Sequence, residues 1–156
     1  MKTIQFNKTE MQEFLKLNGK SFFVSRAVVP QPELGMDWKG LYQIADDQID
    51  LPDCLCPFEI GSDLLIREQV KIIGANIDKT DPTIWQVHLQ YTADSTETWQ
   101  ECPKRLTRQY PSGPPIGATL TCFVEACRYK LHVSGVGLDH NKNANRWEWL
   151  LCLEQP

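Results

Sequence analysis

The stretch C-P-F-E-I-G-S-D-L-L-I-R-E, residues 56–68, ends in an acid on an otherwise apolar side of a predicted strand. From residue 64 onward the apolar residues alternate, and alternate side chains of a β-strand point to the same face. One face carries Leu64, Ile66, Glu68, Val70 and Ile72, whereas the other is of mixed polarity. The pattern therefore predicts that Glu68 is turned into the core. Burial disfavours a charged carboxyl group unless a cation or several hydrogen-bond donors compensate, so this acid is either paired for structure or kept for chemistry.

Length and composition are typical of one soluble domain covering residues 1–156. A chain of this size buries roughly 68–70% of the surface that its unfolded form exposes, so it needs neither a metal nor a disulfide to fold. Apolar residues make up 42% and charged residues 23%. No apolar run is long enough for a membrane span, and the first residues do not form a signal peptide. These features predict a cytoplasmic protein without membrane contact.

The net charge of −4 argues against a large nucleic-acid surface, because affinity for the phosphate backbone comes mostly from Lys and Arg. A small local site stays compatible with this charge. The densest basic cluster is formed by Lys104, Arg105 and Arg108, and Arg128 with Lys130 forms another. Short basic runs of this kind are usually solvated surface.

Six cysteines at positions 54, 56, 102, 122, 127 and 152 contain no C-x-x-C pair. Cys54 and Cys56 lack a second pair or a nearby histidine at the spacing of a zinc site. Several of the others lie in apolar runs and are typical of small buried side chains in a reducing compartment. The sequence therefore predicts no metal site and no cofactor.

The remaining elements follow from capping and alternation. Asn7 with Glu10 three residues later resembles a capping box, which predicts a helix that ends near Gly19. Alternation predicts strands over 22–29, 84–92, 118–133 and 147–153, with a hairpin over 35–50, an irregular proline-rich segment over 92–117 and a polar loop over 134–145. One helix and several strands with long loops favour an α+β, mostly β fold in the form of a small barrel.

The strand at 22–29 also places a charge among apolar neighbours. Arg26 shares its predicted face with Phe22, Val24 and Val28. Arg26 and Glu68 are therefore candidates to neutralise each other inside the fold, which would satisfy both without any catalysis.

Four stretches together resemble the ASCH domain, a PUA-like β-barrel family, and in particular the small ASCH-like proteins of bacteriophages and prophages. Residues 19–32, ending R-A-V-V-P-Q-P, resemble the family segment G-R-K-T-Q-T-R-R-V-V-K-P-Q-P. Residues 56–68 resemble C-P-Y-G-x-P-G-D-x-L-W-V-R-E. Residues 91–94, Y-T-A-D, resemble Y-R-A-D, and residues 145–149, N-R-W-E-W, resemble N-P-W-V-W. The stretches occur in the family's order and span most of the chain.

This resemblance implies a cleft beside the barrel, near the end of the first helix, where related domains bind RNA or nucleotides. One branch of the family removes acyl groups from the exocyclic nitrogen of cytidine with a Lys, a Thr three residues later and a Glu on a strand. Glu68 matches that Glu. An ungapped comparison places Ser21 on the Lys and Val24 on the Thr, whereas a shift by one residue places Lys20 on the Lys. Valine has no hydroxyl, so the known chemistry is lost or rebuilt from Ser21 or Ser25.

Three hypotheses follow for function. The first is a module that binds RNA or a modified nucleoside without turnover, and the second is an amidohydrolase on N4-acylated cytidine. The third is a phage accessory protein that inhibits a host or defence protein by direct binding, to which an acidic surface would contribute by charge complementarity. The candidate catalytic residues are Glu68, Lys20 and Ser21, and the candidate ligand-binding residues are Arg26, Ser25, Arg67 and Trp38.

Overall fold

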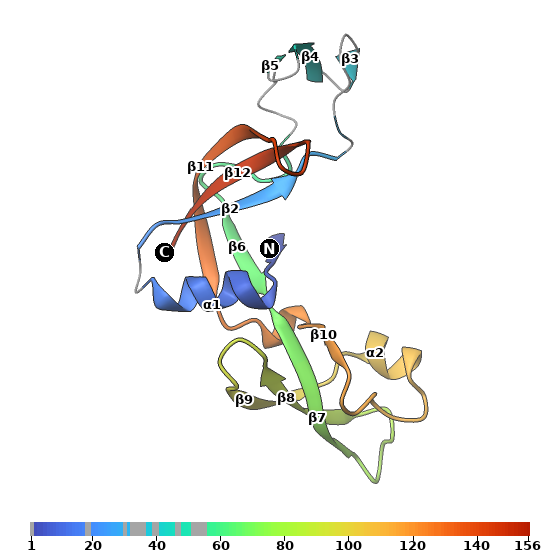
Figure 1. Ribbon diagram of the computed structural model, residues 1–156. Helices are drawn as coiled ribbons and strands as arrows, with labels where there is room; N and C mark the ends of the chain where they lie inside the picture. The colour runs from blue at the N-terminus through green and yellow to red at the C-terminus, as the bar shows by residue number, and fades with distance from the viewer. Residues whose placement is uncertain are drawn as a thin grey trace. The chain divides into compact units, whose positions relative to one another are not determined.

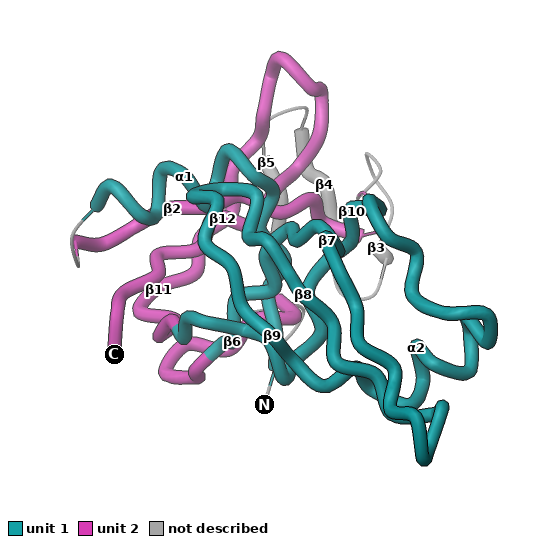
Figure 2. Tube along the Cα trace, turned by 90° about the horizontal axis from the view of Figure 1, so that it is seen from below, with its two compact units in different colours: residues 1–18, 64–130 teal, residues 19–63, 131–156 magenta. Residues whose placement is uncertain are grey.

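The computed structural model describes residues 2–17, 20–29, 31 and 56–156, together with the backbone of residues 37–38, 41–45 and 48–50 (Figure 1). The described chain is mostly β, with one helix near the N-terminus, as the sequence predicted. It divides into two units, coloured separately in Figure 2. The first unit holds residues 1–18 and 64–130, and the second holds residues 19–63 and 131–156.

In the first unit, helix α1 (Lys8–Lys16) begins where the sequence predicted. The Asn7 side chain accepts a hydrogen bond from the Glu10 backbone N–H, and the Glu10 side chain accepts one from the Asn7 N–H. This capping box satisfies two backbone donors at the start of the helix. The helix buries Met11 and Phe14.

Two strands, β6 (Asp63–Arg67) and β7 (Gln69–Ile77), flank Glu68. Strand β6 pairs in parallel with β1 (Lys2–Gln5), so that Ile4 lies opposite Ile66. Strand β7 instead joins a separate sheet. Leu64, Ile66, Val70 and Ile72 are all buried, which confirms the alternation predicted through this stretch.

That separate sheet has the strand order β10-β7-β8-β9, with β8 at Trp85–Tyr91, β9 at Glu97–Glu101 and β10 at Thr119–Thr121. Its pairs are all antiparallel. One face is apolar because every second residue of β8 is buried, and it packs on the segment after β10. The core contains Val70, Ile72, Trp85, Val87, Leu89, Tyr91, Cys102, Cys122, Phe123 and Ala126.

Two elements of this unit depart from the predicted pattern. The proline-rich segment expected to be irregular contains β9 and a short helix, α2 (Lys104–Gln109). The single strand predicted over 118–133 is wrong. It is interrupted after β10 by a 3₁₀ turn, η2 (Val124–Ala126), and a new strand, β11 (Lys130–Asn141), begins at residue 130.

The second unit is built on an antiparallel hairpin. Strand β11 pairs with β12 (Arg146–Glu154), and β12 pairs on its other side with β2 (Phe22–Ala27). Hence the loop predicted over 134–145 is mostly strand. Trp147, Trp149, Leu151 and Leu153 are buried, as their alternation predicted. The predicted hairpin at 35–50 corresponds to β3 (Asp37–Trp38), β4 (Leu41–Ala45) and β5 (Gln48–Asp50), which pair in order.

The described strands form open sheets, and this corrects the barrel expected from the sequence. Within the first unit, β9 and β10 are the edges of the four-stranded sheet and do not pair with each other. Alternation predicts which face of a strand is buried, but it does not predict whether the two edge strands meet. No helix in the described residues is long and apolar enough to cross a bilayer.

Candidate functional site

Glu68 lies where the chain passes from one sheet to the next. Its side chain is 1% exposed, which confirms the inward orientation predicted from alternation. Its backbone carbonyl accepts a hydrogen bond of 2.8 Å from the Cys122 N–H. The backbone of Glu68 is therefore fixed between β6 and β7 and is bonded to the segment that follows β10.

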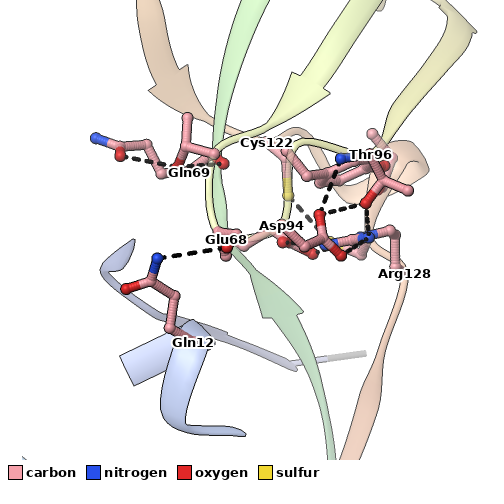
Figure 3. A network of polar contacts seen from close by, with 12 residues as sticks. Gln12, Glu68, Gln69, Asp94, Thr96, Cys122 and Arg128 are labelled. Carbon is pink, nitrogen blue, oxygen red and sulfur yellow. Dashed lines mark hydrogen bonds and ion pairs between the residues drawn. The ribbon is translucent and has the colours of Figure 1, made fainter. Parts of the chain in front are cut away.

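The partner of this carboxylate is Arg128, which stands 60 residues further along the chain. Arg128 Nη2 donates to Glu68 Oε1 at 2.6 Å, and Arg128 Nε donates to Glu68 Oε2 at 3.0 Å (Figure 3). Two parallel N–H···O bonds make this a bidentate pair, the strongest arrangement available to an arginine and a carboxylate. Both oxygens of Glu68 are thus engaged.

A second acid lies on the other side of the same guanidinium group. Arg128 Nη1 donates to Asp94 Oδ2 at 2.9 Å and to Thr96 Oγ1 at 2.7 Å. Arg128 Nη2 also approaches Asp94 Oδ1 at 3.4 Å, and the Thr96 hydroxyl donates to Asp94. All N–H groups of the guanidinium therefore point at acceptors, and one cation lies between two carboxylates.

The face of the guanidinium group is covered by aromatic rings. Arg128 Cζ lies 3.8 Å from the centre of the Tyr91 ring and 5.1 Å from that of Tyr129. Such cation–π contacts are strongest where water is excluded. The Tyr91 hydroxyl donates to the Ala126 carbonyl at 2.5 Å, and burial raises the pKa of Tyr91 to about 12. The ring is thus a neutral, fixed support for the cation.

The hydrogen bonds of this cluster favour the charged forms of Arg128 and Asp94. Burial opposes the charge of Arg128, but the hydrogen bonds to Glu68 and Asp94 outweigh burial and raise the pKa of Arg128. Burial likewise opposes the charge of Asp94, but the hydrogen bonds from Arg128 and Thr96 outweigh it and lower the pKa of Asp94. Arg128 thus bridges two carboxyl groups, and both oxygens of the buried one, Glu68, accept hydrogen bonds from it.

The lowered pKa of Asp94 gives a pH dependence that can be measured. A carboxyl group whose pKa is lower in the folded state stabilises the fold above its unfolded pKa, near 3.8, and this stabilisation is lost as the pH falls further. We expect Asp94→Asn to lower the free energy of unfolding by less than about 1 kcal/mol at pH 6, because the Asp94 side chain is 30% exposed. In urea unfolding, the difference in the free energy of unfolding between Asp94→Asn and the wild-type protein should narrow towards pH 3. A gap that does not change with pH would contradict the role given to Asp94.

Of the predicted site residues, Glu68 and Arg67 are held in the first unit. Arg67 is half-buried, and its Nε donates to the Cys122 carbonyl at 2.8 Å, so it braces the same segment that holds Glu68. Arg128 binds both carboxylate oxygens of Glu68, whereas Arg26, the partner expected from the sequence, belongs to the second unit. Arg26 lies opposite Trp149 on β12, and its Nη1 donates to the Ser25 carbonyl at 2.7 Å.

The other predicted site residues belong to the second unit. Lys20 and Ser21 are exposed, and the Ser21 hydroxyl donates to Glu154 Oε1 at 3.4 Å. Ser25 is exposed on β2, and its side chain hydrogen-bonds Glu148 and contributes to the lowered pKa of that acid, after Arg146 and Asn141. Trp38 is in β3, and its side chain lies outside the described residues.

Sequence reasoning missed Arg128 as the partner of Glu68. Arg128 was noted only as a basic residue near Lys130, although it stands directly before an aromatic residue, Tyr129. Asp94 belongs to the quoted Y-T-A-D stretch, but no role followed from its position. A tertiary ion pair has no signature in local periodicity, so only a comparison of all cations with the one inward acid could have suggested it.

Free thiols are present at positions 102, 122, 127 and 152. Cys122 Sγ and Cys127 Sγ lie 3.8 Å apart beside the core of the first unit. Within the described residues, no group of three or more His, Cys, Asp or Glu side chains is placed to hold a metal ion. Comparisons with protein-family models, with curated proteins and with solved structures found no match.

Proposed function

We propose that the chain is a cytoplasmic, ASCH-like domain that binds RNA or a nucleobase or nucleotide without amidohydrolase chemistry. The observation that supports binding without turnover is that Glu68 is buried and paired with Arg128. Both of its carboxylate oxygens accept hydrogen bonds from Arg128, and its side chain is 1% exposed. A general base must lie within hydrogen-bond reach of the proton that it removes, and a carboxyl group that is buried and bound through both oxygens is poorly accessible to a substrate.

The hydroxyl that such chemistry needs is also absent from the matching position. Val24 is 4% exposed and lies opposite Leu151 on β12, so it is a core residue of the second unit. The nearby Ser21 hydroxyl is paired with Glu154. A nucleophile needs a base within hydrogen-bond distance, and the acid beside Ser21 is on the exposed end of β12.

The ligand class of this proposal comes from the sequence. The four stretches resemble a family whose members bind RNA or nucleotides. Of the candidate ligand-binding residues, Ser25, Arg26 and Trp38 belong to the second unit and Arg67 belongs to the first. A chain of net charge −4 would bind RNA through few phosphate contacts. We therefore expect weak, saturable binding with a shallow dependence on salt.

Two measurements test this proposal. In fluorescence anisotropy, short single-stranded RNAs should bind saturably at about 50 mM salt and several-fold more weakly at about 200 mM salt. Incubation with N4-acetylcytidine should release no cytidine. Absence of saturable binding at the lower salt would remove the RNA proposal and favour a host or defence protein as partner, whereas release of cytidine would establish the hydrolase instead.

A further inference from the structure

A cleft of about 450 Å³ opens in the first unit between α2 and the turn that precedes β8. It is lined by Pro82, Thr83, Trp85, Lys104, Thr107, Arg108 and Pro111. Its volume is within the range of small-molecule sites in proteins, roughly 300–1,000 Å³. None of these residues takes part in the Glu68 network.

The charged groups of this lining are both cations. Lys104 and Arg108 are four residues apart on α2 and therefore share one face of the helix. Like charges at this spacing disfavour a helix, so an anion between them would relieve an existing repulsion. Among the described residues, neither side chain forms an ion pair, whereas Arg105 between them lies 3.7 Å from Glu125.

Asp81, the residue before Pro82 in the cleft lining, is hydrogen-bonded within its own turn. Asp81 accepts hydrogen bonds from the Thr83 N–H at 3.0 Å and from the Thr83 hydroxyl at 2.6 Å. These bonds to Thr83, more than the charge of Lys104, lower the pKa of Asp81. The turn is therefore fixed, and the acid is already satisfied locally.

The other walls of the cleft are apolar and rigid. Trp85 is 2% exposed, and its indole N–H donates to the Pro82 carbonyl at 3.0 Å, which locks the ring beside the proline. Pro111 lines the same cleft, and the Thr107 hydroxyl is turned back onto the Lys104 carbonyl at 2.9 Å. The cleft thus joins a cationic part to an apolar part.

We propose that this cleft binds a nucleoside 5′-phosphate, either as a free nucleotide or as the phosphorylated end of an RNA. The phosphate lies between Lys104 and Arg108, and the planar base packs on the exposed prolines Pro82 and Pro111. Arginine and lysine are the side chains that bind phosphate best, one through a fork of donors and one as a point charge. This site is separate from the residues that carry the proposed function above, so each can fail without the other.

Calorimetric titration of the full chain with adenosine 5′-monophosphate tests the site. We expect binding with a dissociation constant below about 1 mM, and at least about tenfold weaker binding of adenosine, which lacks the charge-assisted bonds. Ribose 5-phosphate should also bind more weakly than the nucleotide, because it lacks the base. No detectable binding of the nucleotide, or equal binding of either fragment, would overturn the proposal.

The matched variants use the same helix. The double variant Lys104→Gln, Arg108→Gln should weaken nucleotide binding at least about tenfold, whereas Arg105→Gln should change it by less than about twofold. All three residues are exposed, so circular dichroism should show an unchanged fold. An equal loss of nucleotide affinity in Arg105→Gln would show that binding depends only on the net positive charge of the helix, and it would overturn the assignment.

A final pair of ligands identifies the source of the phosphate. A short RNA with a 5′-phosphate is compared with the same RNA carrying a 5′-hydroxyl. Tighter binding of the phosphorylated RNA than of the free nucleotide assigns the site to RNA ends, and the reverse order assigns it to free nucleotides. If the two RNAs bind equally and the double variant does not weaken binding of adenosine 5′-monophosphate, the cleft has no phosphate site.

Discussion

Replacing Arg128 with methionine is expected to lower the free energy of unfolding by about 3–5 kcal/mol, because it leaves a buried carboxylate without its cation. Glu68 is 1% exposed and the Arg128 side chain 19% exposed, so water screens this pair poorly. The substitution also removes the cation from the face of Tyr91. Urea unfolding at neutral pH measures the change.

The double variant Arg128→Met, Glu68→Leu separates the charge effect from packing. Removing both members of a buried ion pair is often neutral or stabilising, so the double variant should regain most of the loss. Arg105→Met is the matched control, because the Arg105–Glu125 pair is exposed and 3.7 Å long and should contribute less than about 1 kcal/mol. A loss below 1 kcal/mol in the single Arg128 variant would show that the pair does not hold the fold together.

The result bears on function as well as stability. If Glu68 is needed mainly to balance Arg128, then the double variant should keep its fold and should bind RNA as the wild-type protein does in the test of the proposed function. If Glu68 itself contacts a ligand, the double variant should fold but lose binding. Stability and binding measured on the same variant therefore separate the structural role of this acid from a functional one.

The alternation at residues 64–72 predicted the buried face correctly because side-chain direction in a strand depends only on local backbone geometry. The same holds for α1, whose capping box is closed by Asn7 and Glu10, three residues apart. The partner of Glu68 could not be predicted in this way. Arg26 and Arg128 both lie near apolar residues in the sequence, and only the turn at η2 brings Arg128 to the carboxylate.

The segment between β8 and β10 was the hardest to predict. Its prolines suggested a loop, yet α2 forms there with Pro103 as its N-cap, where the missing N–H of proline costs no helical hydrogen bond. A helix of six residues is too short to show a clear amphipathic pattern in the sequence. The structure, and not the sequence, therefore shows that Lys104 and Arg108 share the face that lines the cleft. Two residues of the basic cluster in the sequence, Lys104 and Arg108, thus line the cleft.

The four stretches that carry the family resemblance form two pairs, and the two members of each pair are in contact within one unit. In the first unit, Tyr91 lies opposite Val70, two residues after the stretch that ends at Glu68, and Asp94 shares Arg128 with that acid. In the second unit, Gln31 of the stretch 19–32 hydrogen-bonds Trp147 of the stretch 145–149. The shared residues are therefore placed where they hold strands together, which gives each of them a structural reason to be present whether or not the chain belongs to the family.

Gln31 illustrates this best, because its side chain bonds the main chain of Trp147 next to the backbone bond of 3.1 Å from the Val28 N–H to the Trp147 carbonyl. The Trp147 N–H donates to Gln31 Oε1 at 2.6 Å, and Gln31 Nε2 donates back to the Trp147 carbonyl at 2.9 Å. This double exchange is the one made by a hydrogen-bonded residue pair in an antiparallel ladder. Gln31 Nε2 also donates to the Val28 carbonyl at 2.6 Å, so one amide group ties the end of β2 to the start of β12.

We therefore expect Gln31→Ala to lower the free energy of unfolding by about 2–3 kcal/mol, since it removes these bonds and leaves the N–H of a buried residue unpaired. Trp147 is 6% exposed. Gln31→Glu keeps the acceptor but sets a carboxylate against two carbonyl oxygens, so it should be at least as severe. Gln12→Ala is the matched control, because Gln12 makes one long bond of 3.4 Å to the Ala93 carbonyl. Hydrogen exchange of the Trp147 amide should become faster in the Gln31 variants alone. If that amide stays protected, or Gln12→Ala costs as much, the side chain does not act as a rung of the sheet.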